Sequence, residues 1–263
     1  MKVMTNNPAI LVSIKQFLIE VGELTYFAAR FFRDVFKRPF EFKEFLRQCY
    51  NVGNKSLLLV GVSGLIIGIV LTLQSRIPLV SFGAVSLVPR MVGIAIIREI
   101  GPIITALICA GRISSGIGAE LGSMRVTEQI DAMEVSGTNP FKYLIVTRIL
   151  ATTLMLPLLV IFNDAIALFG SALVENAKGG VSFELFYDRM IAGLEFVDVI
   201  PSTIKTFFFG FAIGLVGCYK GYHCTSGTEG VGKAANAAVV QTSMWLFIID
   251  FIAVLVADIF FDL

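Results

Sequence analysis

Charge is scarce in this sequence, and histidine is almost absent. Asp, Glu, Lys and Arg make up 16% of the 263 residues, whereas soluble domains carry about 25%. With a single histidine, we expect neither a histidine-based catalytic centre nor a His-rich metal site. The formal net charge of +1 lacks the basic excess that is typical of nucleic-acid-binding proteins, so we expect no nucleic-acid partner.

Cysteine is sparse as well. The four cysteines form no C-x-x-C pair, and we expect them to be reduced packing residues. Cys218, His223 and Cys224 lie close together in the sequence, but no fourth ligand accompanies them. We therefore expect neither a metal site nor a cofactor.

Apolar residues, in contrast, are abundant and gather in long runs. They make up 56% of the chain, and about 20 mostly apolar residues suffice to cross the roughly 30 Å hydrocarbon core of a membrane. The runs predict an all-α membrane protein with five transmembrane helices, over residues 56–73, 91–110, 144–174, 200–219 and 237–261.

The first 50 residues follow a different pattern. Between residues 8 and 38, apolar residues recur at helical spacing with charged residues between them. This pattern predicts an amphipathic helix lying in the membrane interface; a helix packed on a partner protein is the alternative. A second short helix, over 41–50, is expected to lead into the first span. We therefore divide the chain into an N-terminal interfacial segment, 1–50, and a five-span membrane domain, 51–263.

The positions of Lys and Arg predict the orientation, because these residues are enriched in cytoplasmic loops. Most of them lie in residues 1–55, 111–143 and 220–236, whereas the segment 175–199 holds more acidic than basic residues. We expect the N-terminus in the cytoplasm and the C-terminus on the outer side.

Among the charged residues inside the predicted spans, five are candidate site residues: Arg98, Glu99, Asp164, Lys205 and Asp250. Each costs roughly 2.5–3.5 kcal/mol to insert, so each should face a partner or a cavity. At about 1.5 Å of rise per residue, Arg98, Lys205 and Asp250 share one level in the outer half of the membrane. Arg98 and Glu99 are neighbours that point in different directions, so each needs its own partner. Charged residues at one level of the membrane have three possible roles. They could form ion pairs between helices, a polar lining for a charged head group, or a proton relay.

Glycines recur at the spacing that allows helices to approach closely. The pairs are Gly64 with Gly68, Gly118 with Gly122, and Gly210 with Gly214. These contacts are expected within one subunit or between subunits.

The segment 227–234, GTEGVGKA, matches the start of a phosphate-binding loop, G-x-x-x-x-G-K. Ala234 replaces the hydroxyl that would bind Mg²⁺, and a membrane span precedes the segment instead of a strand. We expect no nucleotide site here, but a tight cytoplasmic turn before the fifth span.

A polar, amphipathic segment over residues 112–140 connects the second and third spans. Its acidic and apolar residues interleave: Glu128, Ile130, Asp131, Met133, Glu134 and Val135. The pattern predicts a short cytoplasmic helix that Gly137 and Pro140 bound, with Thr127 as its N-cap. Such a helix is either an ordinary connection or the place where a partner pushes on the membrane part.

Two long segments of the sequence resemble the signature regions of one family. The segment 98–140, REIGPIITALICAGRISSGIGAELGSMRVTEQIDAMEVSGTNP, and the segment 217–240, GCYKGYHCTSGTEGVGKAANAAVV, are similar in order to those of the MlaE-type permeases of lipid ABC transporters. The similarity covers roughly residues 50–262, and the span count and the interfacial helix suit the family. Lys233 stands where the family often has Arg, which keeps the charge.

The resemblance implies the permease subunit of an ATP-driven transporter that moves phospholipids between the inner and outer membranes of a bacterium, without an enzymatic site of its own. It implies an inner-membrane homodimer with two cytoplasmic ABC ATPase subunits and a periplasmic lipid-binding partner of the MCE type. The expected coupling helix spans 128–137 and seats in the ATPase through Glu128, Gln129, Ile130, Asp131, Met133 and Glu134. The expected lipid cavity holds Arg98, Glu99 and Lys205, with Asp250 added by its depth, and Arg98 and Lys205 would attract the lipid phosphate.

Two other functions compete with this one. A stand-alone secondary transporter or channel would use Glu99 and Asp250 as ion-coupling groups and would need no ATPase; the lack of an evident inverted repeat counts against it. A membrane enzyme acting on lipid would need a His-rich, Ser-centred or metal-ligand constellation, and the sequence offers none.

Overall fold

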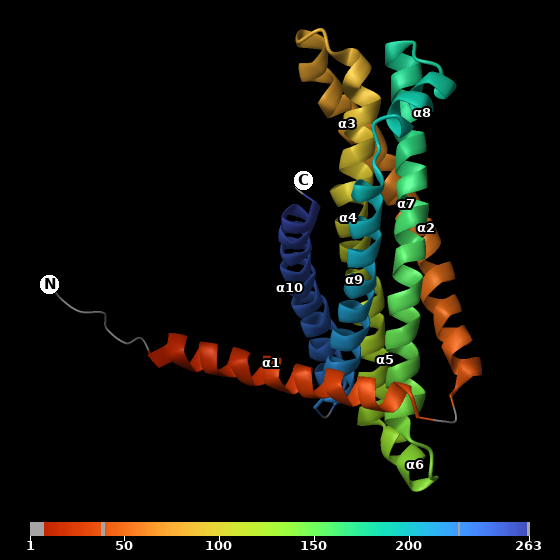
Figure 1. Ribbon diagram of the computed structural model, residues 1–263. Coiled ribbons are helices and arrows are strands. Elements are labelled where there is room, and N and C mark those ends of the chain that lie inside the picture. The colour runs from red at the N-terminus through yellow and green to blue at the C-terminus, as the bar shows by residue number, and fades with distance from the viewer. Residues whose placement is uncertain (1–7, 38–39, 226, 262–263) are drawn as a thin grey trace, which may run out of the picture.

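The computed structural model describes residues 8–37, 40–225 and 227–261, with side chains from Leu18 to Phe260. Every regular element in these ranges is a helix. The helices form a long bundle, and α1 lies across one end of it (Figure 1). In chain order the elements are α1 (Pro8–Val35), α2 (Phe42–Ser81), η1 (Val85–Leu87), α3 (Val88–Ala95), η2 (Ile96–Ile100), α4 (Gly101–Cys109), η3 (Ala110–Ser114), α5 (Ser115–Val126), α6 (Gln129–Val135), η4 (Phe141–Val146), α7 (Thr147–Gly179), α8 (Phe183–Ile191), α9 (Phe196–Tyr222) and α10 (Thr228–Phe261).

Within the described ranges, five helical stretches are long and apolar enough to cross a membrane, which confirms the predicted number. They run over Phe42–Ser81, Val85–Val126, Phe141–Gly179, Phe196–Tyr222 and Thr228–Phe260. Each stretch is longer than the predicted span, because the helix continues beyond the apolar run into polar residues.

The first span corrects one prediction. The expected separate helix over 41–50 is instead the beginning of α2, which runs unbroken for 40 residues. Gly53 does not end the helix. A Cβ at this position would lie 2.4 Å from the Met155 methyl carbon, so the glycine allows α7 to approach closely.

The second span contains two wide π-helical turns, η2 and η3. Pro102 follows η2 and has no N–H, so the carbonyl five residues earlier, that of Ile97, lacks its helical donor. The hydroxyl of Ser202 donates to this carbonyl over 2.6 Å. The wide turn therefore binds α9 through a backbone group that proline leaves free.

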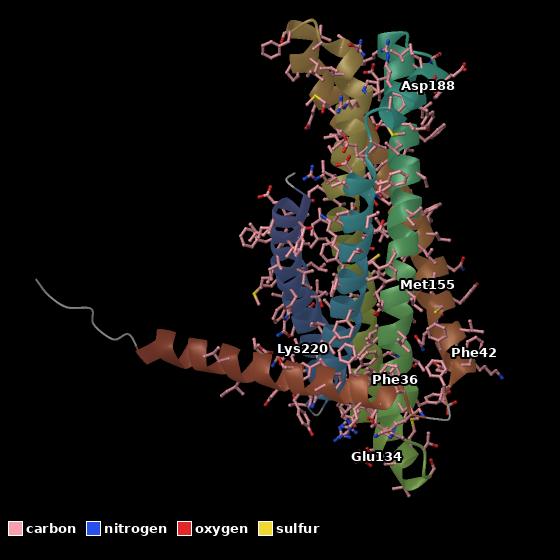
Figure 2. All side chains as sticks on the ribbon, viewed as in Figure 1. Phe36, Phe42, Glu134, Met155, Asp188 and Lys220 are labelled. Carbon is pink, nitrogen blue, oxygen red and sulfur yellow. The ribbon has the colours of Figure 1, made fainter. Side chains whose placement is uncertain are left out.

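The connections lie at two opposite ends of the bundle. Helices α1 and α6 and the α9–α10 connection share one end, and α3 and α8 share the other (Figure 1). We call these the α6 end and the α8 end. Glu134 lies at the first and Asp188 at the second (Figure 2).

Helix α1 is amphipathic, as predicted, and it is fastened to the bundle. Phe27 and Phe31 are buried, and the Arg30 guanidinium lies 4.1 Å from the Phe141 ring centroid. Glu20 accepts a hydrogen bond from Lys220, which adds an ion pair to α9. Among its described side chains, Leu18, Ile19, Tyr26 and Phe32 point outward instead, as does Phe36 just beyond the helix. The side chains of Lys15 and Phe17, which belong to the same pattern, lie outside the described residues.

The short helix between the second and third spans is present as α6, but the segment before it differs from the prediction. Residues 112–126 are not a loop, because they continue the second span as η3 and α5. Thr127 does not cap α6, since its hydroxyl donates to the Ser123 carbonyl one turn back in α5. Glu128 makes the turn with a φ of 58°, and Gly137 follows the helix with a φ of 81°.

The glycine-rich segment before the fifth span is not the predicted tight turn. Only Gly227 has a left-handed backbone, with a φ of 93°, and α10 begins at the next residue. Lys233 pairs with Glu229 one helical turn earlier, at 2.7 Å. A helical backbone cannot wrap a phosphate as a phosphate-binding loop does, which agrees with the expectation of no nucleotide site here.

Glycine sets the closest contacts between the spans. A Cβ at Gly68 would lie 1.9 Å from the Ala167 carbonyl oxygen, and one at Gly210 would lie 2.5 Å from that of Thr152. Backbone therefore packs on backbone where α2 and α9 cross α7. The glycines of these two pairs act within one chain.

We expect Gly68→Ala to destabilise the bundle by roughly 1–3 kcal/mol, because the added methyl forces α2 away from α7. Gly22→Ala in α1 is the matched control, since a Cβ there meets nothing within 4 Å and alanine favours a helix by about 0.5–1 kcal/mol. Thermal unfolding in detergent measures both changes. Equal melting temperatures for the two variants would contradict the close contact.

Candidate functional site

The charges inside the spans gather where η2 meets α9 and α10. Lys205 lies at the centre and is 4% exposed. Its Nζ donates to Glu99 Oε2 over 2.6 Å and to Asp250 Oδ1 over 3.0 Å. One ammonium thus joins three spans, and the predicted ion pairing between helices is present.

Arg98 points away from this triad, as the helical geometry predicted. Its guanidinium lies 3.7 Å from Asp198 Oδ1, and the Arg98 side chain is 37% exposed. The Arg98–Asp198 pair is longer than the Lys205–Glu99 pair, and its cation is more exposed to solvent. Arg98 therefore keeps hydrogen-bond donors free for a ligand.

Asp198 is a site residue that we did not predict from the sequence. It lies in the first turn of α9, where its Oδ2 accepts a hydrogen bond from the Glu195 backbone N–H over 3.0 Å. Glu195 and Asp198 form a capping box. The sequence pattern that could have identified Asp198 is Glu195-x-x-Asp198 directly before an apolar run. This pattern marks the start of a helix, here near the depth of Arg98.

These residues line a small polar cavity that runs into an apolar groove. The cavity holds about 30 Å³ and is lined by Arg98, Glu99, Asp198, Ser202 and Lys205, together with small residues of α10. The groove holds about 400 Å³ between α9 and α10. Its walls are largely apolar: Ile200, Ile204, Phe208, Ile249, Ile252 and Val256. Lys205 and Ala253 belong to both spaces. The polar cavity has room for only a water or two, so it is a polar recess that adjoins the apolar groove.

Asp164 does not join this cluster. It lines a separate cavity of about 260 Å³ with Pro157 and Ser202. Its Oδ1 is buried and has no hydrogen-bond partner within the described part of the chain. The structure thus brings together four of these five candidate residues, all except Asp164.

Helix α6 presents an acidic surface at the α6 end. Ile130 is fully buried against the bundle, and Met133 packs beside the same core. Glu128, Gln129, Asp131 and Glu134 are exposed, with Val135 90% exposed beside them. Ile130 and Met133, which we predicted to contact the ATPase, therefore pack α6 against the bundle. The polar residues and Val135 form its outward surface.

An ion pair fastens α6 to α5. Arg125 Nη1 lies 2.6 Å from Asp131 Oδ1. Because α5 continues through η3 and α4 to η2, one helical stretch, Val85–Val126, connects the surface of α6 with the residues Arg98 and Glu99. A displacement of α6 can therefore reach the cavity along a single span.

Cys218 is buried and Cys224 half-buried, and both are free thiols. The described residues contain no cluster of His, Cys, Asp and Glu suited to a metal ion.

Five apolar helices, with a polar cavity and an apolar groove among the second, fourth and fifth of them, define a multi-pass membrane protein. A family model described as "Permease MlaE" matches residues 45–256. The chain belongs to this family, which confirms the resemblance of the two signature segments.

Individual relatives agree. A "Probable ABC transporter permease protein" of Rickettsia conorii is 34% identical over 94% of both chains. The "Intermembrane phospholipid transport system permease protein MlaE" of Haemophilus influenzae is 34% identical over 79% of this chain and 80% of its own. The Arabidopsis thaliana protein "TRIGALACTOSYLDIACYLGLYCEROL 1, chloroplastic" is 32% identical over 83% of this chain and 62% of its own length.

We expect Lys205→Met to destabilise the protein by about 3–5 kcal/mol, because two carboxylates lose the cation they share inside the membrane. Adding Asp250→Asn should recover part of the loss, since it removes one uncompensated charge. Lys233→Met is the control: that side chain is 77% exposed, and its pair contributes at most about 0.5 kcal/mol. Melting temperatures in detergent test the series, and an unaffected Lys205→Met variant would refute the structural role of the triad.

Proposed function

We propose that this chain is the permease subunit of an ATP-driven transporter that moves phospholipids between the inner and outer membranes. The continuity of the polar cavity with the apolar groove carries the proposal, because a phospholipid needs both environments side by side. The relative in Haemophilus influenzae, by its name, serves intermembrane phospholipid transport.

We assign the phosphate contact to Arg98. Its guanidinium is partly exposed and loosely paired, and its planar fork suits phosphate oxygens. Lys205 already forms ion pairs with two carboxylates, those of Glu99 and Asp250. Its role is therefore to fix the positions of the polar residues that line the cavity. The Glu99 side chain is 39% exposed, and its carboxylate stays paired with Lys205 at the edge of the cavity.

Two cytoplasmic ABC ATPase subunits would supply the energy through α6. The acidic, exposed surface of this helix is a suitable contact, and its fixed attachment to the second span gives the movement a route to Arg98 and Glu99. Hydrolysis would thus alter the cavity without any nucleotide site in the permease.

The assembly would be a homodimer that meets at the outward face of α10. Only 11% of the apolar window of this span is buried within the chain, so a second copy could cover the groove from the other side. A periplasmic lipid-binding protein of the MCE type would exchange lipid with the cavity.

In the proposed orientation the α6 end is cytoplasmic and the C-terminus periplasmic, in a bacterial inner membrane. The basic residues around α1, α5 and α6 support this orientation. The competing ion-coupled transporter would need Glu99 and Asp250 free to load an ion, whereas Lys205 occupies both.

We expect the pair of substitutions Glu128→Lys and Glu134→Lys to reduce copurification of the co-expressed ATPase by about tenfold or more, because the contact surface reverses its charge. Asp131 is left intact since it holds Arg125. Asp188→Lys is the control, because it is exposed at the opposite end (Figure 2). Undiminished ATPase binding with full lipid transfer would show that α6 is not the contact.

We expect Arg98→Gln to lower the phospholipid recovered with the purified complex about fivefold, which corresponds to ~1 kcal/mol for one cation–phosphate contact. The ATPase should still bind. Arg90→Gln, outside the cavity at the α8 end, is the matched control. Quantitative lipid extraction measures the effect, and equal lipid content in both variants would exclude Arg98 as the head-group contact.

A further inference from the structure

A second polar cavity lies near the α6 end, between α2 and α5. It holds about 370 Å³, and none of its lining residues belongs to the Arg98 cavity. Its polar lining consists of Arg47, Gln48, Asn51, Lys55, Arg112 and Glu120. Gly116 also faces it, and a Cβ there would meet nothing within 4 Å, so the space in front of this glycine is open.

Positive charge prevails in this cavity. Lys55 and Arg112 form no ion pair with any residue that the structure describes, and Arg112 donates only to the Ser56 hydroxyl, over 2.5 Å. Arg47 lies 3.6 Å from Glu44, and its side chain is 73% exposed. Three cations therefore converge on one open space with most of their donors unused.

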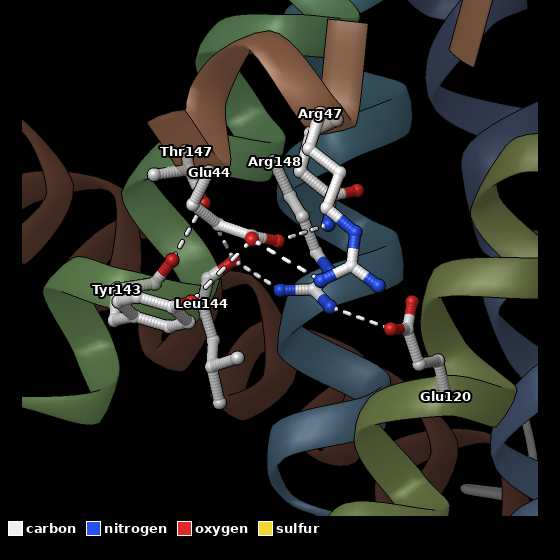
Figure 3. A network of polar contacts seen from close by, with 8 residues as sticks. Glu44, Arg47, Glu120, Tyr143, Leu144, Thr147 and Arg148 are labelled. Carbon is white, nitrogen blue, oxygen red and sulfur yellow. Dashed lines mark hydrogen bonds and ion pairs between the residues drawn. The ribbon is translucent and has the colours of Figure 1, made fainter. Parts of the chain in front are cut away.

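A rigid network forms the wall behind these cations (Figure 3). Arg148 is 2% exposed and donates to Glu120 Oε1 over 2.8 Å and to the Leu144 carbonyl over 2.9 Å. Glu44 accepts a hydrogen bond from Gln48 over 2.7 Å. Glu120 is the one acidic residue of the lining and is paired with Arg148. Against Arg47, Lys55 and Arg112 it leaves the lining with a net positive charge.

The cavity lies at the depth of lipid head groups. Lys55 is the last charged residue of α2 before an apolar run, and Arg112 is the first after the apolar run of α4. Along α2, exposed apolar residues continue from Lys55 at helical spacing: Leu58, Val62 and Ile66, which are 80%, 51% and 54% exposed. The cationic cavity thus lies at the end of a row of exposed apolar residues on α2 that an acyl chain could contact.

We propose that this cavity binds the phosphate head group of an anionic phospholipid from the leaflet at the α6 end. In the orientation proposed above this is the cytoplasmic leaflet. The site is separate from the Arg98 cavity, so a lipid can occupy each of them at once. Lys55 and Arg112 bind the phosphate, and Arg47 covers it from the rim.

The test is native mass spectrometry of the full-length, delipidated permease in detergent, titrated with phosphatidylglycerol. The variant Lys55→Gln/Arg112→Gln should bind one phosphatidylglycerol about thirtyfold more weakly, at about 1 kcal/mol per cation. Gly116→Trp keeps every charge and fills the space, and it should abolish the same binding event. Phosphatidylethanolamine should bind this site more weakly than phosphatidylglycerol.

Lys43→Gln/Lys233→Gln is the matched control. It also removes two positive charges, from exposed positions that do not line the cavity, and it should leave phosphatidylglycerol binding unchanged. Every variant is repeated in an Arg98→Gln background. The loss caused by Lys55→Gln/Arg112→Gln should persist in full there, which separates this site from the cavity of the proposed function.

Three results would overturn the proposal. The first is unchanged phosphatidylglycerol binding in both Lys55→Gln/Arg112→Gln and Gly116→Trp. The second is displacement of the lipid by glycerol 3-phosphate at equal concentration, which would identify a site for soluble phosphate. The third is loss of ATPase binding in these variants with lipid binding intact, which would identify a protein contact.

Discussion

The contact between Lys205 and its two carboxylates is the constraint on which the membrane part depends. A single ammonium within a membrane is costly, and so is a single carboxylate. Shared by Glu99 and Asp250, the charge of Lys205 offsets both and joins η2, α9 and α10. The position of these three helices determines where the polar cavity ends and where the apolar groove begins.

Arg98 gains its freedom from the same arrangement. Arg98 lies within the π-helical turn η2. Pro102 has no N–H to donate to the Ile97 carbonyl, so this carbonyl accepts a hydrogen bond from Ser202 instead. Ile97 thus holds the backbone of this turn against α9. Glu99 points to Lys205, and Arg98 lines the cavity. Two adjacent residues of opposite charge thus face different partners, Glu99 the Lys205 ammonium and Arg98 the Asp198 carboxylate.

Much of this was predictable, and the failures have physical reasons. Hydropathy located five spans, and depth alone brought Arg98, Lys205 and Asp250 to one level. Asp198 was missed because it lies at a helix start that composition assigned to a loop. The separate helix over 41–50 and the tight turn over 227–234 were wrong because helix packing and helix propagation override such local preferences. The orientation of Ile130 toward the core depends on tertiary contacts that no local pattern contains.

The second span joins the two polar cavities. Arg98 and Arg112 are fourteen positions apart on one helical stretch, which corresponds to about 20 Å along its axis, most of the roughly 30 Å hydrocarbon core. At that spacing the two arginines cannot both lie among head groups: Arg112 follows the apolar run of α4, whereas Arg98 lies within the span, and α6 is attached to the end of the same stretch. In the proposed function, a push on α6 would move both cationic positions together, because one helical stretch carries them.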